Sequence, residues 1–339
     1  MNSQSFGLSA GMTRRSLLSA GAALAVAAAM DRPRVARAAE LNFCAALGWT
    51  SYDSGRHMVN GYKDAVAKLG GNLTIADAGY DVKKQADQIA SFVAAKADAI
   101  FITPADPAGI SPAVRGALDA GIPVFLADSY VPNATATSVA MSNNFGLGYY
   151  TADFICKRLK GKGNIAAVVL PANETWDERT LGLKAALRLY PDVKLAAEFS
   201  FANASGMTPR QAVDSLLTGH QDLDAVWCGW DGAATEGALA IKAAGRSKMF
   251  ITGIDGGRQA FEYIKSGSPM VLTMAQSFYE MAYMNVLYAH EKIAGREAPR
   301  FIITATYPVT QDKLTSLPEI PDNYDQPGEA DKLGWQRVL

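Results

Sequence analysis

The feature that most constrains the fold is an alternation of short apolar runs with helix-length amphipathic segments. Strands are predicted at 41–47, 72–78, 99–104, 123–128, 137–142, 164–170, 194–200, 225–230, 249–254, 269–276 and 300–306. Helices are predicted between them at 56–69, 82–95, 109–120, 143–160, 175–189, 207–218, 232–245, 257–265 and 278–294. Most strand runs are apolar on both faces, which is typical of parallel strands covered by helices on both sides. The alternation predicts a doubly wound α/β architecture.

The alternation restarts part-way along the chain. Residues 41–128 contain four strand–helix units, and residues 164–254 contain four more with similar spacing. We therefore expect two parallel-sheet lobes joined by a three-strand hinge, with the chain passing between them near 141–144, 276–278 and 306–309. The expected lobes are 39–142 plus 277–306 and 143–276 plus 307–314. The tail, 315–339, is expected to pack along the surface as irregular structure.

The N-terminal residues 1–38 are predicted to be an export signal. Arg14-Arg15 precede an apolar run at 17–30 that is too short to span a bilayer but fits the core of a signal peptide. Ala36-Arg37-Ala38 supplies the small residues that signal peptidase accepts, and cleavage is expected after Ala38, with Ala39 as the alternative. The paired arginines indicate a twin-arginine signal; the alternative is an ordinary secretory signal. Both interpretations place the mature protein in the periplasm.

Composition argues against several classes of protein. The 339 residues include 32 Lys and Arg and 33 Asp and Glu; removal of 1–38 leaves a net charge of −5, so no nucleic-acid partner is expected. Only three cysteines (Cys44, Cys156, Cys228) and three histidines are present, far apart, and so neither a metal site nor a disulfide scaffold is expected. Cys44 and Cys228 lie in apolar runs and are expected to be buried. No G-x-G-x-x-G or G-x-S-x-G motif occurs after residue 38, so no cofactor and no catalytic residues are expected.

Polar and aromatic side chains follow the predicted strands. They are Trp49, Tyr52, Asp53, Asp128, Trp176, Arg179, Trp230, Asp231, Asp255 and Gln276. Ligands of open α/β sheets bind beyond the carboxyl ends of the strands, and two facing lobes would bring these residues to one cleft. Carboxylates, amides and an arginine can bind hydroxyl groups, and aromatic faces can cover C–H surfaces, which indicates a sugar or polyol ligand.

Each of these residues also has a simpler interpretation. Asp53, Asp106 and Asp231 precede or open helices and could cap them. Arg179 could be a solvated surface charge, and the tryptophans could belong to the core. His57, one turn into a helix beside the expected cleft, is the one histidine that could contact a ligand.

Several stretches resemble the ribose-binding-protein-like family of periplasmic sugar-binding proteins. They are Ile102-Thr103-Pro104-Ala105-Asp106-Pro107, Gly121-Ile122-Pro123-Val124, Gly161-Lys162-Gly163-Asn164, Leu216-Leu217-Thr218-Gly219-His220, Gly253-Ile254-Asp255-Gly256 and Thr273-Met274-Ala275-Gln276. The resemblance implies two α/β lobes joined by three crossings and no enzymatic activity. It implies that Asp128 is the acidic acceptor of the first lobe, Arg179 the cleft arginine, Asp255 the aspartate of the second lobe and Gln276 the hinge glutamine.

The chain departs from the pentose-binding pattern of that family. Ser54-Gly55 stand where stacking phenylalanines are expected, Ser129 replaces an arginine, and Trp230 replaces an asparagine. The resemblance therefore implies a different monosaccharide, a linear polyol or a less sugar-like solute rather than ribose.

The expected function is that of a monomeric periplasmic solute-binding protein of an ABC importer. It would bind a sugar or polyol and deliver it to the transporter permease. One alternative is a sensor that presents its closed form to a chemoreceptor or sensor kinase. The other is an exported α/β enzyme.

Overall fold

A computed structural model describes residues 40–171, 174–200 and 206–338. The predicted export signal, 1–38, lies outside these residues. Leu41–Leu339 form one compact unit, which is described below. Among the described residues, no helix combines the length and the apolar character needed to cross a membrane.

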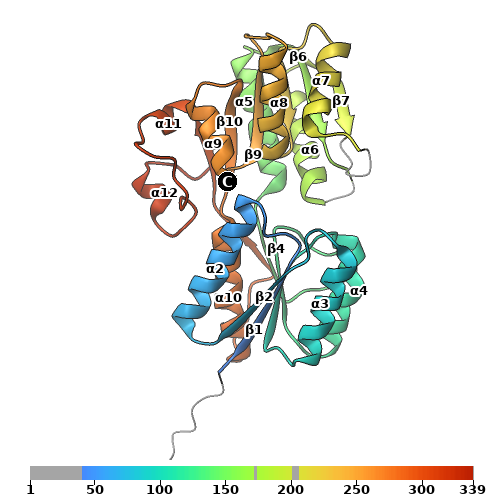
Figure 1. Cartoon of the computed structure of the whole chain (residues 1–339), viewed down its shortest axis with the longest axis vertical. Helices are drawn as coiled ribbons and strands as arrows, with labels where there is room; N and C mark the ends of the chain where they lie inside the picture. Colours follow the sequence, from blue (N-terminus) through green and yellow to red (C-terminus); the bar gives the residue numbers. More distant parts are fainter. Residues whose placement is uncertain (1–39, 172–173, 201–205, 339) are drawn as a thin grey trace, which may run out of the picture. The chain divides into compact units, whose positions relative to one another are not determined.

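The first sheet contains six strands and all its pairings are parallel. The strands are β1 (Asn42–Leu47), β2 (Asn72–Asp77), β3 (Ala99–Thr103), β4 (Val124–Ala127), β5 (Ser138–Met141) and β11 (Phe301–Ile303), in the order β11-β5-β4-β3-β1-β2. The helices α2 (Asp53–Leu69) and α10 (Phe278–Ile293) cover one face, and α3 (Val82–Ala94) and α4 (Pro107–Asp119) cover the other (Figure 1). This arrangement buries both faces of the sheet, as the continuous apolar strand runs predict.

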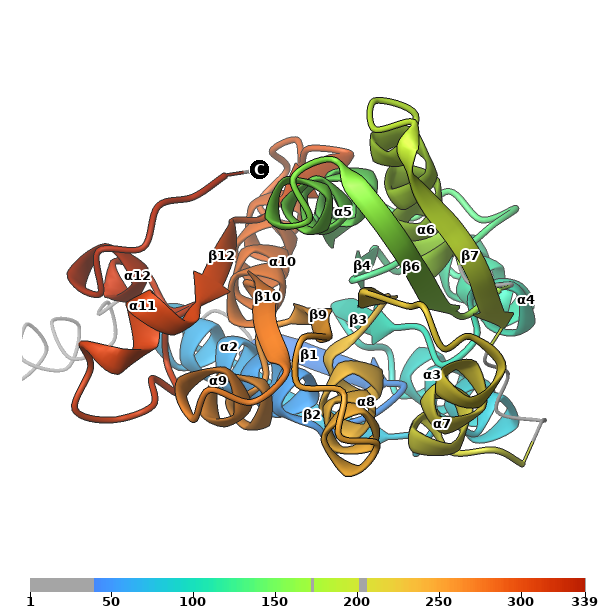
Figure 2. The same cartoon turned by 90° about the horizontal axis from the view of Figure 1, so that it is seen from above.

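The second sheet repeats this plan with one antiparallel edge strand. Its strands are β6 (Lys162–Val169), β7 (Asp192–Ser200), β8 (Ala225–Cys228), β9 (Phe250–Asp255), β10 (Met270–Gln276) and β12 (Thr306–Thr310), in the order β12-β10-β9-β8-β6-β7. Only β12 runs antiparallel, against β10. The helices α5 (Asn144–Arg158) and α6 (Glu174–Leu187) cover one face; α7 (Pro209–Gly219), α8 (Asp231–Ala243) and α9 (Arg258–Lys265) cover the other (Figure 2). The prediction of two α/β lobes with parallel sheets is confirmed.

The chain passes between the two sheets three times. The passages lie between β5 and α5, between β10 and α10, and between β11 and β12. The segment 300–306, expected to be one strand, is divided between the two sheets. Thr306 already pairs with Gln276 of the second sheet, so the third passage lies at 304–305, ahead of the expected 306–309.

Helices α5 and α6 pack unusually closely, and this contact positions Arg179. A Cβ added at Gly148 of α5 would lie 1.8 Å from the carbonyl oxygen of Arg179, and one at Gly182 of α6 would lie 2.0 Å from that of Phe145. Glycine at both positions lets the two backbones touch. The start of α6, and with it Arg179, is thereby held against the second sheet.

Two expectations about other parts of the chain have different outcomes. Cys44 and Cys228 are buried as predicted, and Cys156 is buried with them; all three are free thiols. The tail was expected to lie along the surface as irregular structure. Among the described residues beyond α11 (Gln311–Thr315) it is irregular apart from the short α12 (Glu329–Lys332), but it inserts Tyr324 and Trp335 into the core of the second lobe instead of lying wholly on the surface.

Candidate functional site

Arg179 lies at the centre of the residues that gather beyond the strand ends. Its side chain is only 2% exposed, so the interpretation as a solvated surface charge is wrong. Nε donates to Oδ1 of Asn144 at 3.0 Å, and Nη1 donates to the carbonyl oxygen of Gly229 at 2.7 Å. Nη1 also lies 3.3 Å from Oδ1 of Asp255. These contacts hold the guanidinium group against the ends of β8 and β9.

Asp255 ends β9 in a backbone conformation that L-residues seldom adopt, with φ of 131°. Its Oδ1 accepts a hydrogen bond from Nε2 of Gln276 at 2.8 Å, in addition to the contact with Arg179. Burial raises the pKa of Asp255, and the charge of Arg179 opposes that rise. Strained residues of this kind persist when surrounding contacts hold them, and they cluster at ligand sites.

Asp128 follows β4 and faces this group from the first sheet. Its φ is 70°, and its carbonyl oxygen accepts a hydrogen bond from Oγ1 of Thr175 in the second lobe at 3.2 Å. Burial raises the pKa of Asp128 to about 6; Arg179 lowers it and Asp255 raises it. Thr175 lies one turn before Arg179 in α6, so Asp128 contacts the start of the helix that carries Arg179. The structure therefore brings together Asp128, Arg179, Asp255 and Gln276, as the sequence predicts.

Two acceptor atoms in this group lack partners. Within the part of the chain that the structure describes, Oδ1 of Asp128 and Oε1 of Gln276 are buried without a hydrogen bond. A buried acceptor left unpaired costs about 1–3 kcal/mol, so native structures normally satisfy such atoms. Hydroxyl or amine donors of a bound molecule could fill both positions.

The carboxylates of Asp231 and Asp53 accept hydrogen bonds from backbone amides of other segments. Oδ2 of Asp231 accepts hydrogen bonds from the amides of Gly256 and Gly257 at 2.8 and 3.0 Å, and Oδ1 accepts from Oγ1 of Thr273 at 2.7 Å. Asp231 therefore shapes the loop after Asp255 rather than capping its own helix.

Asp53 acts in a similar way across the two lobes. Its Oδ2 accepts a hydrogen bond from the amide of Arg258 at the start of α9 at 2.7 Å, and its Oδ1 pairs with Arg56 at 2.9 Å. Asp106, by contrast, caps its own helix: Oδ1 accepts from the amides of Ala108 and Gly109.

Aromatic rings form two groups, one in each lobe. In the first, Trp49 stacks on Tyr80 with centroids 5.5 Å apart and planes 4° apart, and Tyr52 meets Tyr80 edge-on at 6.4 Å. In the second, Trp176 and Trp230 lie 5.9 Å apart at 47°. Flat rings of this kind suit the C–H faces of a sugar or polyol.

A comparison with known protein families decides the class of protein. The sequence profile described as "Periplasmic binding protein domain" matches residues 47–297, most of the chain. This chain belongs to the periplasmic binding protein family. Its resemblance to the ribose-binding-protein-like members is confirmed as well.

Individual relatives of this periplasmic binding protein agree in fold and class. The ribose import binding protein of Bacillus subtilis is 30% identical over 209 residues, 60% of this chain and 66% of that protein. The xylitol-binding protein of Mycolicibacterium smegmatis is 26% identical over 272 residues, 79% of this chain and 78% of that protein. The crystal structure of an ABC sugar transporter subunit from Rhodobacter sphaeroides aligns with a TM-score of 0.74 and 26% identity, covering 80% of this chain and 98% of that one.

Sequence reasoning missed three residues of this periplasmic binding protein's site. Tyr80 follows β2, and its ring stacks on Trp49 and meets Tyr52 edge-on. Its position after a predicted strand could have revealed it by the rule that found Asp128. Asn144, the partner of Arg179, begins α5 directly after a passage between lobes. Tyr324, described below, carries no signal in the sequence.

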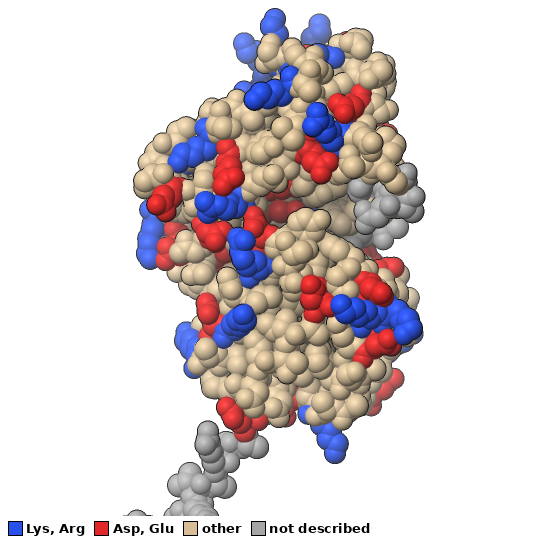
Figure 3. All heavy atoms as spheres, viewed as in Figure 1, with Lys and Arg blue, Asp and Glu red and all other residues tan. Residues whose placement is uncertain are grey.

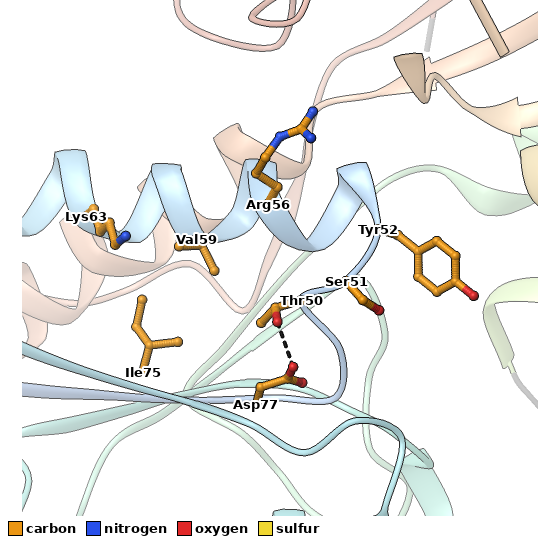
Figure 4. A pocket seen from close by; sticks show the side chains of 8 residues that line it. All are labelled: Thr50, Ser51, Tyr52, Arg56, Val59, Lys63, Ile75 and Asp77. Atoms are coloured by element: carbon orange, nitrogen blue, oxygen red, sulfur yellow. Dashed lines mark hydrogen bonds between the residues drawn. The ribbon is translucent and has the colours of Figure 1, made fainter. Parts of the chain in front are cut away.

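A separate pocket lies in the first lobe beside α2 and β2. It has a volume of about 420 Å³ and is lined by residues of α2, β2 and the loop before α2: Thr50, Ser51, Tyr52, Arg56, Val59, Lys63, Ile75 and Asp77 (Figure 4). Oγ1 of Thr50 donates to Oδ2 of Asp77 at 2.6 Å on its wall. Tyr52 is its single lining residue among the ten predicted, and the group around Arg179 lies elsewhere, so this pocket is not the site assembled above.

Proposed function

We propose that this periplasmic binding protein binds a monosaccharide or polyol between its two sheets and delivers it to the permease of an ABC importer. The observation that carries the proposal is the pair of unpartnered buried acceptors, Oδ1 of Asp128 and Oε1 of Gln276, beside the buried Arg179. A polyhydroxylated ligand offers donors to both acceptors and oxygens to the guanidinium group. The ligands named for the ribose- and xylitol-binding relatives share this chemistry.

Each site residue has a role in this proposal. Asp128 and Asp255 accept hydroxyl hydrogen bonds from opposite lobes, and Arg179 donates to neighbouring ligand oxygens while it offsets their charge. The Trp49–Tyr80 stack and the Trp176–Trp230 pair cover the C–H faces of the ligand. Because both lobes contribute, ligand contacts are complete only when the lobes close, and closure about the three passages would present one form to the permease.

Export would place this protein in the periplasm, where it could meet such a ligand. We propose that Arg14-Arg15 direct it to the twin-arginine route, with cleavage after Ala38. Replacement of both arginines by lysine is expected to leave the precursor in the cytoplasm; cell fractionation measures this. Unchanged export would favour the ordinary secretory signal.

A ligand screen tests the binding proposal directly. The mature chain is expected to unfold at a higher temperature with one or a few members of a panel of pentoses, hexoses, linear polyols and cyclitols. At a ligand concentration 100 times the Kd, the gain in stability is about 2.7 kcal/mol. Mass spectrometry of ligand released by denaturation should recover it intact, whereas a turned-over product would favour the enzyme alternative. If no panel member stabilises the chain, the proposal fails.

The Asp128→Asn variant makes the screen specific to the site. It is expected to weaken the response to the bound compound, because a charged acceptor becomes a neutral amide. Asp119→Asn, at the exposed end of α4, is the matched control and should respond as the wild type does.

A further inference from the structure

The tail beyond α11 is held in place by buried side chains. The family profile matches residues 47–297, so the tail lies outside the matched region. Tyr324 is 1% exposed and Trp335 2%, and both pack against Phe261 of α9 with ring centroids 5.4 and 5.6 Å away. We call residues 321–338 the C-terminal clasp.

Tyr324 of the clasp reaches the backbone beneath the ligand site. Its hydroxyl group has a single proton, which is shared between the carbonyl oxygens of Gln276, at 2.9 Å from the hydroxyl oxygen, and Asp255, at 3.2 Å. These are the final residues of β10 and β9, whose side chains bond to each other in the site. One hydroxyl group thus joins the two strand ends from behind.

Gly256 shows how closely this hydroxyl group approaches. Its φ is 81°, and a Cβ there would lie 2.6 Å from the Tyr324 hydroxyl oxygen and 2.5 Å from Cβ of Ala275. The neighbouring Asp255 is held in a strained conformation. The contacts that keep it there include Tyr324 behind the backbone and Gln276 and Arg179 at the side chain.

Asp325, the next residue, joins the clasp to the first lobe. Its side chain is buried, and Oδ2 accepts a hydrogen bond from the amide of Tyr279 in the first turn of α10 at 2.9 Å. The same oxygen lies 3.0 Å from Nδ1 of His57 in α2. The side chain of Ser277, the residue before α10, makes no capping hydrogen bond, and the clasp supplies a negative group at that helix N-terminus.

The clasp makes a third contact with the first lobe, at the surface beside the two contacts of Asp325. Asp322 pairs with Arg56 of α2 at 2.8 Å, and Figure 3 shows basic and acidic groups interleaved where α2, α9 and the clasp meet. The clasp therefore contacts α2 and α10 of the first lobe while Tyr324 bonds to the strand ends of the second.

We propose that the C-terminal clasp belongs to the binding machinery, with Tyr324 as the positioning residue for Asp255 and Gln276. This rests on the proposed function of the same site. Without the Tyr324 hydroxyl group, the carbonyl groups of the two strand ends lose a shared donor. The Asp255 and Gln276 side chains are then less often arranged to receive a ligand.

The first experiment compares Tyr324→Phe with Tyr263→Phe by calorimetric titration, using whichever sugar or polyol stabilises the wild type. Tyr263 packs against the same core cluster in α9, so its variant controls for loss of a tyrosine hydroxyl group there. We expect Tyr324→Phe to weaken binding about 3- to 10-fold, the loss of one hydrogen bond, and Tyr263→Phe to change it less than about 2-fold. In a Gln276→Ala background, the effect of Tyr324→Phe should shrink to less than about 2-fold, because coupled residues are not additive.

The second experiment needs no ligand. Hydrogen exchange of the backbone amides at 254–258 and 276–280 is expected to quicken several-fold in Tyr324→Phe and to stay at the wild-type rate in Tyr263→Phe. If the wild type binds no panel compound, the proposed function fails and the exchange rates alone decide the inference. If the wild type binds a compound and the two variants bind it equally, the inference is overturned and the proposed function stands. Unchanged exchange in Tyr324→Phe overturns the inference in either case.

Discussion

The Asp128→Asn substitution should stabilise the protein while weakening its binding. Asp128 has φ of 70°, a conformation that asparagine tolerates as well as aspartate does, so the change removes a charge without adding backbone strain. Oδ1 of Asp128 is a buried acceptor that lacks a partner in the described residues. The substitution therefore isolates the cost of keeping this carboxylate charged.

The magnitude follows from the pKa of Asp128. Burial raises it from 3.8 to about 6, with Arg179 lowering and Asp255 raising it. Protonation therefore favours the folded form: its contribution is complete below pH 3.8 and is lost as the pH rises through about 6. At roughly 1.36 kcal/mol per pH unit, the charged carboxylate costs about 3 kcal/mol of folding free energy above that range.

Urea denaturation followed by tryptophan fluorescence measures this cost. The variant should match the wild type near pH 4 and exceed its free energy of unfolding by up to about 3 kcal/mol at pH 8. Ligand affinity should fall about 10- to 150-fold at pH 8, since hydrogen bonds to charged groups contribute about 1.5–3 kcal/mol. The reasoning is refuted if the variant is the less stable protein at pH 8, or if the exposed control Asp119→Asn shows the same gain.

Three further predictions concern the surroundings of the site. Arg179→Ala and Asp255→Ala should each cost about 2–4 kcal/mol of binding by calorimetry, as for charged partners in a closed cleft; unchanged affinity in both would contradict the site. Burial lowers the pKa of His57. The hydrogen bond and charge of Asp325 raise that pKa by more than burial lowers it, so the net shift is upward. The stabilising pair is complete below about pH 6.5 and lost as the pH rises through the raised value, so His57→Gln should lose more stability at pH 6 than at pH 9 in urea titrations; an equal loss at both would count against the pair. Gly148→Ala should lower both the free energy of unfolding, by more than about 2 kcal/mol, and the ligand affinity, because its Cβ would overlap the carbonyl oxygen of Arg179; near-wild-type values in both would disprove the close packing.

Much of the site could be predicted because the carboxyl end of each parallel strand can be located in the sequence. An apolar run followed by a polar residue marks a carboxyl end, and all such ends meet at one edge of a sheet. That rule located Asp128, Arg179, Asp255 and Gln276. Applied to the turn after β2, it would also have found Tyr80.

The rule did not separate residues that face the cleft from residues that hold the loops. Asp231 follows β8 just as Asp128 follows β4, yet its Oδ1 accepts a hydrogen bond from Thr273 and its Oδ2 accepts from the two amides after Asp255. Which partner a carboxylate finds depends on groups tens of residues away. The same limit applies to the strand predicted at 300–306, which divides between two sheets because Thr306 pairs with Gln276.

The sequence by itself determined the two-lobed α/β plan, since periodicity and strand-end chemistry are local properties of the chain. Only the tertiary structure decided what the tail does. Tyr324 and Asp325 lie in a Pro- and Asp-rich stretch without periodicity, and their partners Gln276, Asp255 and His57 are 48, 69 and 268 residues away. Burial and hydrogen bonding between residues so far apart in sequence depend on how the folded lobes pack. No local sequence pattern can therefore predict them.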